Sequence, residues 1–156
     1  MAAGLQVKYE EGDHQMEWFR VIEHIEDVEP LFPGLTDLYL RFYKRSTAFF
    51  GGSNRVTFIM GRYVVKLPQN YDGIADNDWE GSVRHSPDLG AAKYARTRLI
   101  YVDQIPVLFM EYVEPWSYRD LQKKLGKVPT WVDFIDCQQV GYNRRGQLVA
   151  YDYGIR

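Results

Sequence analysis

Three short runs of alternating apolar and polar residues, separated by turn sequences, lie between residues 47 and 67 and constrain the fold more than any other feature. Residues 47–50, 55–60 and 63–67 have the period of two that is typical of half-buried strands. Residues 51–54, Gly-Gly-Ser-Asn, and residues 61–62, Gly-Arg, are tight-turn sequences. Two successive tight turns join strands that run in opposite directions, so this segment predicts an antiparallel meander.

The residues before this meander have a helical period instead. Residues 13–28 carry apolar side chains at spacings of three and four, and the prolines and glycine of residues 30–34 end this predicted helix. Thr36 is a candidate N-cap for a shorter helix over residues 37–44. Residues 1–12 are expected to form a flexible arm or a short edge strand. We expect both helices to pack their apolar faces on the core.

Beyond the meander the sequence predicts a helix and two more strands. Residues 70–76 have the composition of a polar loop, and residues 75–84 can form a short helix that presents Glu80. Residues 96–102 and 106–112 then have the composition of strands. The second of these strands is apolar almost throughout, which indicates burial.

The C-terminal part contains shorter elements. Ser117 is a candidate N-cap for a helix over residues 118–125, which a glycine ends. Residues 129–134 predict one further helical turn. Residues 143–146 form a turn signal before a short apolar strand over residues 148–151.

Asp152 follows that last strand directly and lies two residues before Gly154. A carboxylate at a strand end, next to a flexible glycine, is well placed to hold a metal ion against a phosphate. The alternative is that Asp152 only caps a turn near the end of the chain. The residue itself leaves both interpretations open.

Lys66 lies among apolar residues of the third predicted strand. Its ammonium must reach water or a partner, because burying it unpaired costs free energy. Glu80 on the next helix is the candidate partner, and we expect the two to form an ion pair inside a cleft. The Gly51-Gly52-Ser53 turn is either a phosphate cover or simply a turn.

Composition limits the classes of function. The 156 residues suit one domain, and a net charge of −2 argues against a nucleic-acid-binding protein that depends on bulk charge. No apolar run approaches the roughly 20 residues that cross a bilayer, and no secretory leader is evident. The single cysteine, Cys137, excludes an intramolecular disulfide. We expect a cytoplasmic protein that binds neither membrane nor nucleic acid.

Taken in order, these features resemble the protein-kinase fold. Val64-Val65-Lys66 is similar to its lysine-bearing strand, residues 110–113 are similar to its fifth strand and hinge, and Asp152-Tyr153-Gly154 is similar to its Asp-Phe-Gly motif. The resemblance implies an ATP site. Its residues would be, for the phosphates, Lys66, Glu80, Gly51, Gly52 and Ser53, and for the adenine, Met110, Glu111 and Val113.

The same resemblance implies Mg²⁺ ligands and a catalytic base. Asp152 would bind the metal, with Gln139 or Gln138 in the place of the usual asparagine. Asp136 or Asp133 would be the base, although Trp131-Val132 stands where kinases have His-Arg. The resemblance covers residues 47–154.

The fold that the resemblance implies is α+β, a single kinase-like domain over residues 1–156. Residues 1–46 would be an N-terminal extension of two helices. Residues 47–113 would be a kinase-like N-lobe, an antiparallel sheet with a helix, that ends in the hinge at residues 110–113. Residues 114–156 would be a strongly reduced C-lobe that ends at Asp-Tyr-Gly. The chain particularly resembles small truncated kinase-like proteins of bacteriophages and bacteria. If it is phage-encoded, the resemblance implies a location in the host cytoplasm.

Two classes of function follow from this resemblance. One is an ATP-dependent phosphotransferase that modifies a partner protein, and the other is an inactive kinase-like protein that docks on a target or inhibits it. Because Arg156 lies two residues beyond Gly154, we expect apolar surface that a second copy or an obligate partner covers. Trp116, Trp131 and Phe134 are the candidate anchors of that interface.

Overall fold

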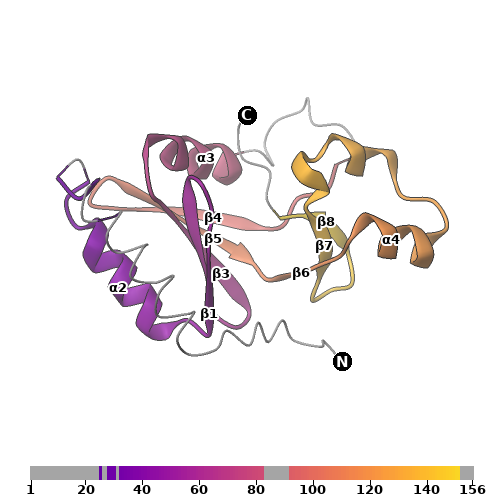
Figure 1. Cartoon of the computed structure of the whole chain (residues 1–156), viewed down its shortest axis with the longest axis horizontal. Helices are drawn as coiled ribbons and strands as arrows, with labels where there is room; N and C mark the ends of the chain where they lie inside the picture. The colour runs from indigo at the N-terminus through magenta and orange to yellow at the C-terminus, as the bar shows by residue number, and fades with distance from the viewer. Residues whose placement is uncertain (1–24, 26–27, 31, 83–91, 152–156) are drawn as a thin grey trace.

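The computed structural model describes residues 25, 28–30, 32–82 and 92–151, which form an α+β fold with two antiparallel sheets (Figure 1). A five-stranded sheet has the order β1-β2-β3-β5-β4, and a three-stranded sheet has the order β6-β7-β8. In chain order the elements are α2 (Leu35–Arg45), β1 (Ala48–Gly51), β2 (Arg55–Ile59), β3 (Tyr63–Pro68), α3 (Tyr71–Ser82), β4 (Thr97–Val102), β5 (Ile105–Glu111), β6 (Val113–Pro115), α4 (Tyr118–Leu125), the 3₁₀ helices η3 (Thr130–Phe134) and η4 (Asp136–Gln138), β7 (Val140–Asn143) and β8 (Leu148–Ala150).

The predicted meander is confirmed. β1, β2 and β3 pair antiparallel in sequence, and β5 and β4 complete the sheet as a second hairpin. The turn between β4 and β5 is formed by Asp103 and Gln104, whose φ angles are 48° and 69°. Positive φ at two successive turn residues gives the backbone twist that matches a tight hairpin. Among the described residues, no helix has the length and apolar content needed to cross a bilayer.

The second predicted N-terminal helix is present as α2, but its predicted cap is wrong. Gly34, at φ 90°, is the N-cap residue, and the helix begins at Leu35. Thr36 instead donates its amide and hydroxyl to the carboxylate of Glu29, at 2.7 and 2.9 Å. The hydroxyl is therefore engaged outside the helix. Most of the first predicted helix, residues 13–28, lies outside the described residues.

The predicted loop over residues 70–76 is also wrong, because α3 begins at Tyr71. The Asn70 side chain accepts a hydrogen bond from the Gly73 amide at 2.9 Å, which caps the first turn of the helix. Polar residues near a helix start satisfy free amides, so a polar composition does not exclude a helix there. Near its other end, α3 passes so close to Leu99 of β4 that only a glycine, Gly81, fits.

The two faces of the large sheet carry different layers, and the alternation along β3 separates them. Val65 and Leu67 join the buried cluster beneath α2, whereas Val64 belongs to the core on the other face. β5 divides its side chains in the same way. Helix α3 packs against β3, β4 and β5 on the face opposite α2 (Figure 1). The face that carries α3 is therefore the one toward which Lys66 is directed.

The small sheet continues from the large one rather than standing apart. Only Tyr112 separates β5 from β6. On the other side, Ala95 donates its amide to the Ala150 carbonyl of β8 at 2.9 Å, just before β4 begins. Leu121 of α4 and Val132 of η3 pack on the small sheet and share one core with Met110 of β5. The backbone therefore joins the two sheets at two places.

Gly141 of β7 packs directly on the backbone of β6. A Cβ atom at this position would collide with the carbonyl oxygen of Glu114. We expect Gly141→Ala to destabilise the protein by roughly 3 kcal/mol, because the clash is with backbone and one of the two strands must shift. Gly146→Ala is the control, because Gly146 has open space around it. This substitution costs only the strain of an alanine at a φ of 72°, about 1 kcal/mol. Urea unfolding of both variants measures the difference, and equal losses would contradict this account.

Candidate functional site

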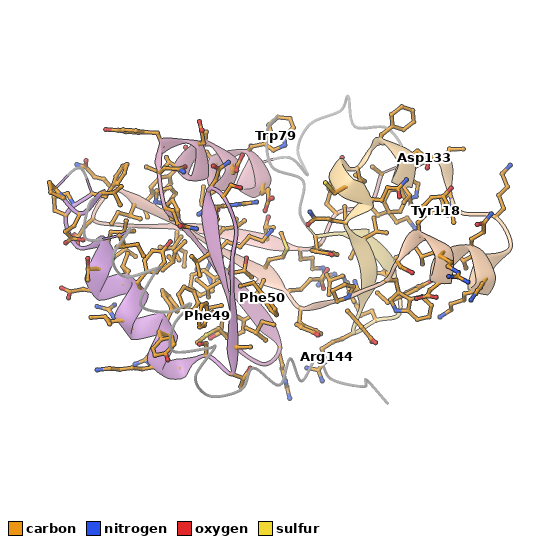
Figure 2. All side chains as sticks on the ribbon, in the orientation of Figure 1. Phe49, Phe50, Trp79, Tyr118, Asp133 and Arg144 are labelled. Carbon is orange, nitrogen blue, oxygen red and sulfur yellow. The ribbon has the colours of Figure 1, made fainter. Side chains whose placement is uncertain are left out.

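A cavity of about 370 Å³ lies where the two sheets meet. This volume falls within the range of roughly 300–1,000 Å³ that is usual for small-molecule sites. The cavity is lined by Phe50, Thr57, Ile59, Val64, Lys66, Met110, Glu111, Tyr112, Val113, Pro115, Gln139 and Tyr151. Figure 2 shows the neighbouring Phe49 and Phe50 on β1, of which Phe49 is buried in the α2 core and Phe50 lines the cavity.

One end of the cavity is charged. The Lys66 Nζ atom lies 3.0 Å from Oε2 of Glu80, so the predicted ion pair is confirmed. The same Nζ donates a hydrogen bond of 2.6 Å to the Tyr151 carbonyl oxygen. Glu80 is completely buried, and Lys66 is only 4% exposed. Lys66 therefore reaches the cavity from the large sheet and contacts the end of the small one.

Arg55 also contacts Glu80, a contact that was not predicted from the sequence. Its Nη2 atom lies 2.7 Å from Oε1 of Glu80, while Nη1 donates to Oδ1 of Asn77 at 3.2 Å. Asn77 in turn donates to the carbonyl oxygens of Lys66 and Pro106. Each carboxylate oxygen of Glu80 therefore has a cation of its own. Arg55 was identifiable, because β2 and β3 place it on the same sheet face as Lys66.

Burial and neighbouring positive charges shift the pKa of the Glu80 carboxyl group in opposite directions. Burial would raise the pKa of its carboxyl group, but the positive charges of Lys66 and Arg55 and their hydrogen bonds outweigh burial and lower that pKa below the usual 4.5. Glu80 therefore stays ionised in the folded protein at pH values where it would be protonated in the unfolded chain.

This pKa shift predicts a loss of stability in acid. The contribution of Glu80 is complete above about pH 4.5 and declines as the pH falls through the lowered pKa, because the unfolded chain then binds more protons. We expect Glu80→Gln to be less stable at neutral pH and to lose less stability on acidification. Urea unfolding between neutral pH and about pH 3 measures both slopes. If the free energies of unfolding of the parent and Glu80→Gln depend on pH in the same way, the lowered pKa of Glu80 is contradicted.

The opposite side of the cavity presents main-chain groups of β6, an edge strand. The Trp116 amide donates to the Val140 carbonyl at 3.1 Å, which fixes which residues of β6 bond to β7. Because bonded and non-bonded pairs alternate along antiparallel strands, the N–H and C=O of Val113 point away from β7. Val113 and Pro115 line the cavity. The edge therefore offers a fixed donor and acceptor to a flat ligand.

Glu111 has a structural connection that the sequence analysis did not predict. Its Oε1 atom accepts hydrogen bonds from the Arg96 amide at 2.9 Å and from Asn143 Nδ2 at 3.3 Å. Its Oε2 atom lies 3.6 Å from Nη2 of Arg145. The Glu111 side chain therefore fastens the large sheet to the β7–β8 turn. Met110, 2% exposed, lies at the apolar wall of the cavity.

The Gly51-Gly52-Ser53 turn is near the cavity but does not line it. Gln69 donates a hydrogen bond of 2.8 Å to the Gly52 carbonyl, and Asn70 donates one of 3.2 Å to the Ser53 carbonyl. These bonds tie the turn to the start of α3. All three turn residues are exposed.

The predicted metal ligands and bases separate into two groups. Gln139 lines the cavity, and its carbonyl oxygen accepts the Tyr151 amide at 3.1 Å, which joins it to the residue before Asp152. Gln138 and Asp133 are exposed, and neither lines the cavity. Figure 2 shows Asp133 on η3. Asp152 lies outside the described residues.

The loop around η4 has an unusual backbone. Cys137 and Gln138 have φ angles of 48° and 52°. Two successive non-glycine residues in the left-handed region cost about 1–2 kcal/mol each. Asp136 is the first residue of η4 and leads into this pair. Such strain is concentrated at functional sites, and this segment leads directly to Gln139 at the cavity.

Within residues 25, 28–30, 32–82 and 92–151, no group of three or more histidine, cysteine, aspartate and glutamate side chains is arranged to hold a metal ion. No protein-family model matches the chain, and comparisons with curated proteins and with solved structures return no match.

Proposed function

We propose that this chain binds ATP in the cavity between its two sheets, in an arrangement like that of protein kinases. One observation carries the proposal: a single cavity has a lysine, paired with a buried glutamate, on one side and an open strand edge on the other. A nucleotide needs both, because its base presents hydrogen-bonding edges and its phosphates carry negative charge. The α+β fold, with its large antiparallel sheet and α3, agrees with a kinase-like N-lobe.

The adenine would lie against β6. The N–H and C=O of Val113 supply a donor and an acceptor at positions that the sheet already fixes, so little ordering is required on binding. Val64 and Met110 provide apolar walls for the flat ring. In this proposal Glu111 contributes its backbone, since its carboxylate is occupied by Arg96, Asn143 and Arg145.

The phosphates would lie toward Lys66, whose Nζ is the cation that lines the cavity among the described residues. Gln139 and Asp152 are the residues that would hold Mg²⁺ beside them, and both provide the oxygen ligands this ion prefers. The hydrogen bond between Gln139 and Tyr151 supports that pairing. When bound, the metal would neutralise charge that develops on the phosphates.

The reaction that this arrangement supports is phosphoryl transfer to a hydroxyl group of a partner protein. The hydroxyl oxygen bonds to the γ-phosphorus, the bond to the ADP oxygen breaks, and the hydroxyl proton passes to a base. Asp136 is the preferred candidate for that base because it lies closer in sequence to Gln139, which lines the cavity, whereas Asp133 is exposed.

Transfer of labelled phosphate from ATP tests this function. The parent chain should transfer label to protein acceptors in a lysate, and Asp152→Asn should lose both this transfer and the Mg²⁺-dependent part of ATP binding. Its melting temperature should remain close to that of the parent. If the parent binds no nucleotide, or if Asp152→Asn binds Mg²⁺-ATP unchanged, the proposed enzyme is excluded.

A docking protein is the second candidate, and the exposed Phe134 favours it. Phe134 on η3 is 88% exposed, whereas the two tryptophans expected beside it, Trp116 and Trp131, are partly buried against the core. Phe134 is the most exposed large apolar side chain among the described residues, and it would mark a contact surface if it belongs to a contiguous apolar patch. Light scattering at micromolar concentration tests whether the chain associates with itself. Association that Phe134→Ser abolishes would support a homo-oligomer, and a monomer would exclude it.

A further inference from the structure

Lys66 is the last member of a row of four charged side chains that alternate in sign. The Asp76 carboxylate lies 3.9 Å from Arg55 Nε. Arg55 Nη2 is 2.7 Å from one oxygen of Glu80, and Lys66 Nζ is 3.0 Å from the other. All four side chains are buried, and Lys66 alone of the four lines the cavity. The row is neutral as a whole, but its positive end faces the cavity.

Because Arg55 contacts Glu80, Lys66 is not alone in compensating the buried charge of that carboxylate. With a short contact between Arg55 and Glu80, the buried carboxylate is compensated on the side away from the cavity. Removing Arg55 would leave Lys66 as the nearest cation to Glu80 among the described residues. Separating Lys66 from Glu80 would then leave a buried charge unpaired, which is costly.

The local structure fixes Arg55 in this role. Lys66 pairs across the hairpin with Thr57, so Arg55 stands two residues along β2 on the same face. Asn77 accepts from Arg55 and donates to the Lys66 carbonyl, which holds both strands against α3. Three side chains of α3, those of Asp76, Asn77 and Glu80, contact the guanidinium, so it has little freedom to leave Glu80.

We propose that Arg55 is a positioning residue for the phosphate end of the cavity. It holds Glu80 and compensates its charge, so that Lys66 directs its ammonium toward an anionic ligand. This inference rests on the proposed ATP site and adds a residue that acts on Lys66 through Glu80 without lining the cavity. A bound phosphate would extend the alternating row by one more charge.

The test compares the affinities of adenosine and ATP, measured by calorimetry without divalent metal. The dissociation constant of adenosine divided by that of ATP gives the preference for ATP, which isolates the contribution of the phosphates. In Arg55→Met this ratio should fall about tenfold, the size expected when one charge-assisted hydrogen bond is weakened. In the double variant Arg55→Met/Glu80→Gln the ratio should recover, because a neutral side chain no longer holds Lys66. Arg55→Lys should retain most of the parent's ratio.

Each outcome decides the inference. An unchanged ratio in Arg55→Met, or no recovery in the double variant, would show that Arg55 does not act through Glu80. If Arg55→Met fails to fold by circular dichroism, the double variant carries the test, and a lost preference for ATP there overturns the inference. If the parent binds neither ligand, the proposed function fails and this inference with it. Tight ATP binding by the parent with an unchanged ratio in Arg55→Met would overturn the inference alone.

Discussion

Glu80→Ala should destabilise the fold by about 3–5 kcal/mol, because it leaves two buried cations without their shared counter-ion. Lys66 and Arg55 are 4% and 8% exposed, so water cannot replace the lost carboxylate without opening the packing of α3 on the sheet. Urea unfolding at neutral pH measures the loss.

Asp78→Ala is the matched control for this prediction. Asp78 lies on the same helix, but it is exposed, and its carboxylate accepts a hydrogen bond only at the surface, from the Tyr101 hydroxyl. We expect its loss to cost less than about 1 kcal/mol. Equal effects of Glu80→Ala and Asp78→Ala would mean that the buried charges do not organise the fold.

Lys66→Met should weaken ATP binding by roughly 10- to 100-fold, the equivalent of one hydrogen bond between charged groups. The affinity for adenosine should change little, because Lys66 lies at the charged end of the cavity and Val113 at its strand edge. The substitution keeps the length of the apolar stem while it removes the charge. Calorimetric titrations with both ligands measure the two effects separately.

Lys44→Met is the control for this loss. Lys44 is exposed at the end of α2, on the opposite face of the large sheet from the cavity. Its substitution removes the same charge from the chain, so any effect of net charge on ATP binding is shared. If Lys44→Met weakens binding as much as Lys66→Met does, Lys66 has no specific part in the site.

Much of the fold was predictable because local chemistry decides it. The strands β1 to β3 follow from alternation and glycine turns, and α4 has the bounds, the serine cap and the final glycine that the sequence predicted. In α4 the Ser117 hydroxyl accepts the Asp120 amide, as the capping pattern requires. The start of α3 was mispredicted because Asn70, a residue of turns, here caps a helix.

The site was predictable only where the sequence places a charged residue that requires a partner. Lys66 in an apolar strand required a partner, and Glu80 supplies it. The Arg55 contact could have been derived from the predicted register, since a tight turn at residues 61–62 places Arg55 on the face of Lys66. The main-chain edge at Val113 depends on the pairing of β6 with β7, between segments far apart in sequence. Alternation within a single strand carries no information about such a pairing.

Calorimetric titration of a cavity-filling variant tests the central claim most directly. Ile59 is partly buried and lines the cavity, whereas Leu40 is 38% exposed on α2. A tryptophan at position 59 would occupy the space that the adenine needs, and one at position 40 would extend into solvent. We expect the parent and Leu40→Trp to bind a single Mg²⁺-ATP with the same affinity, and Ile59→Trp to bind none. Unchanged binding in folded Ile59→Trp, or no binding by the parent, would contradict an ATP site between the two sheets.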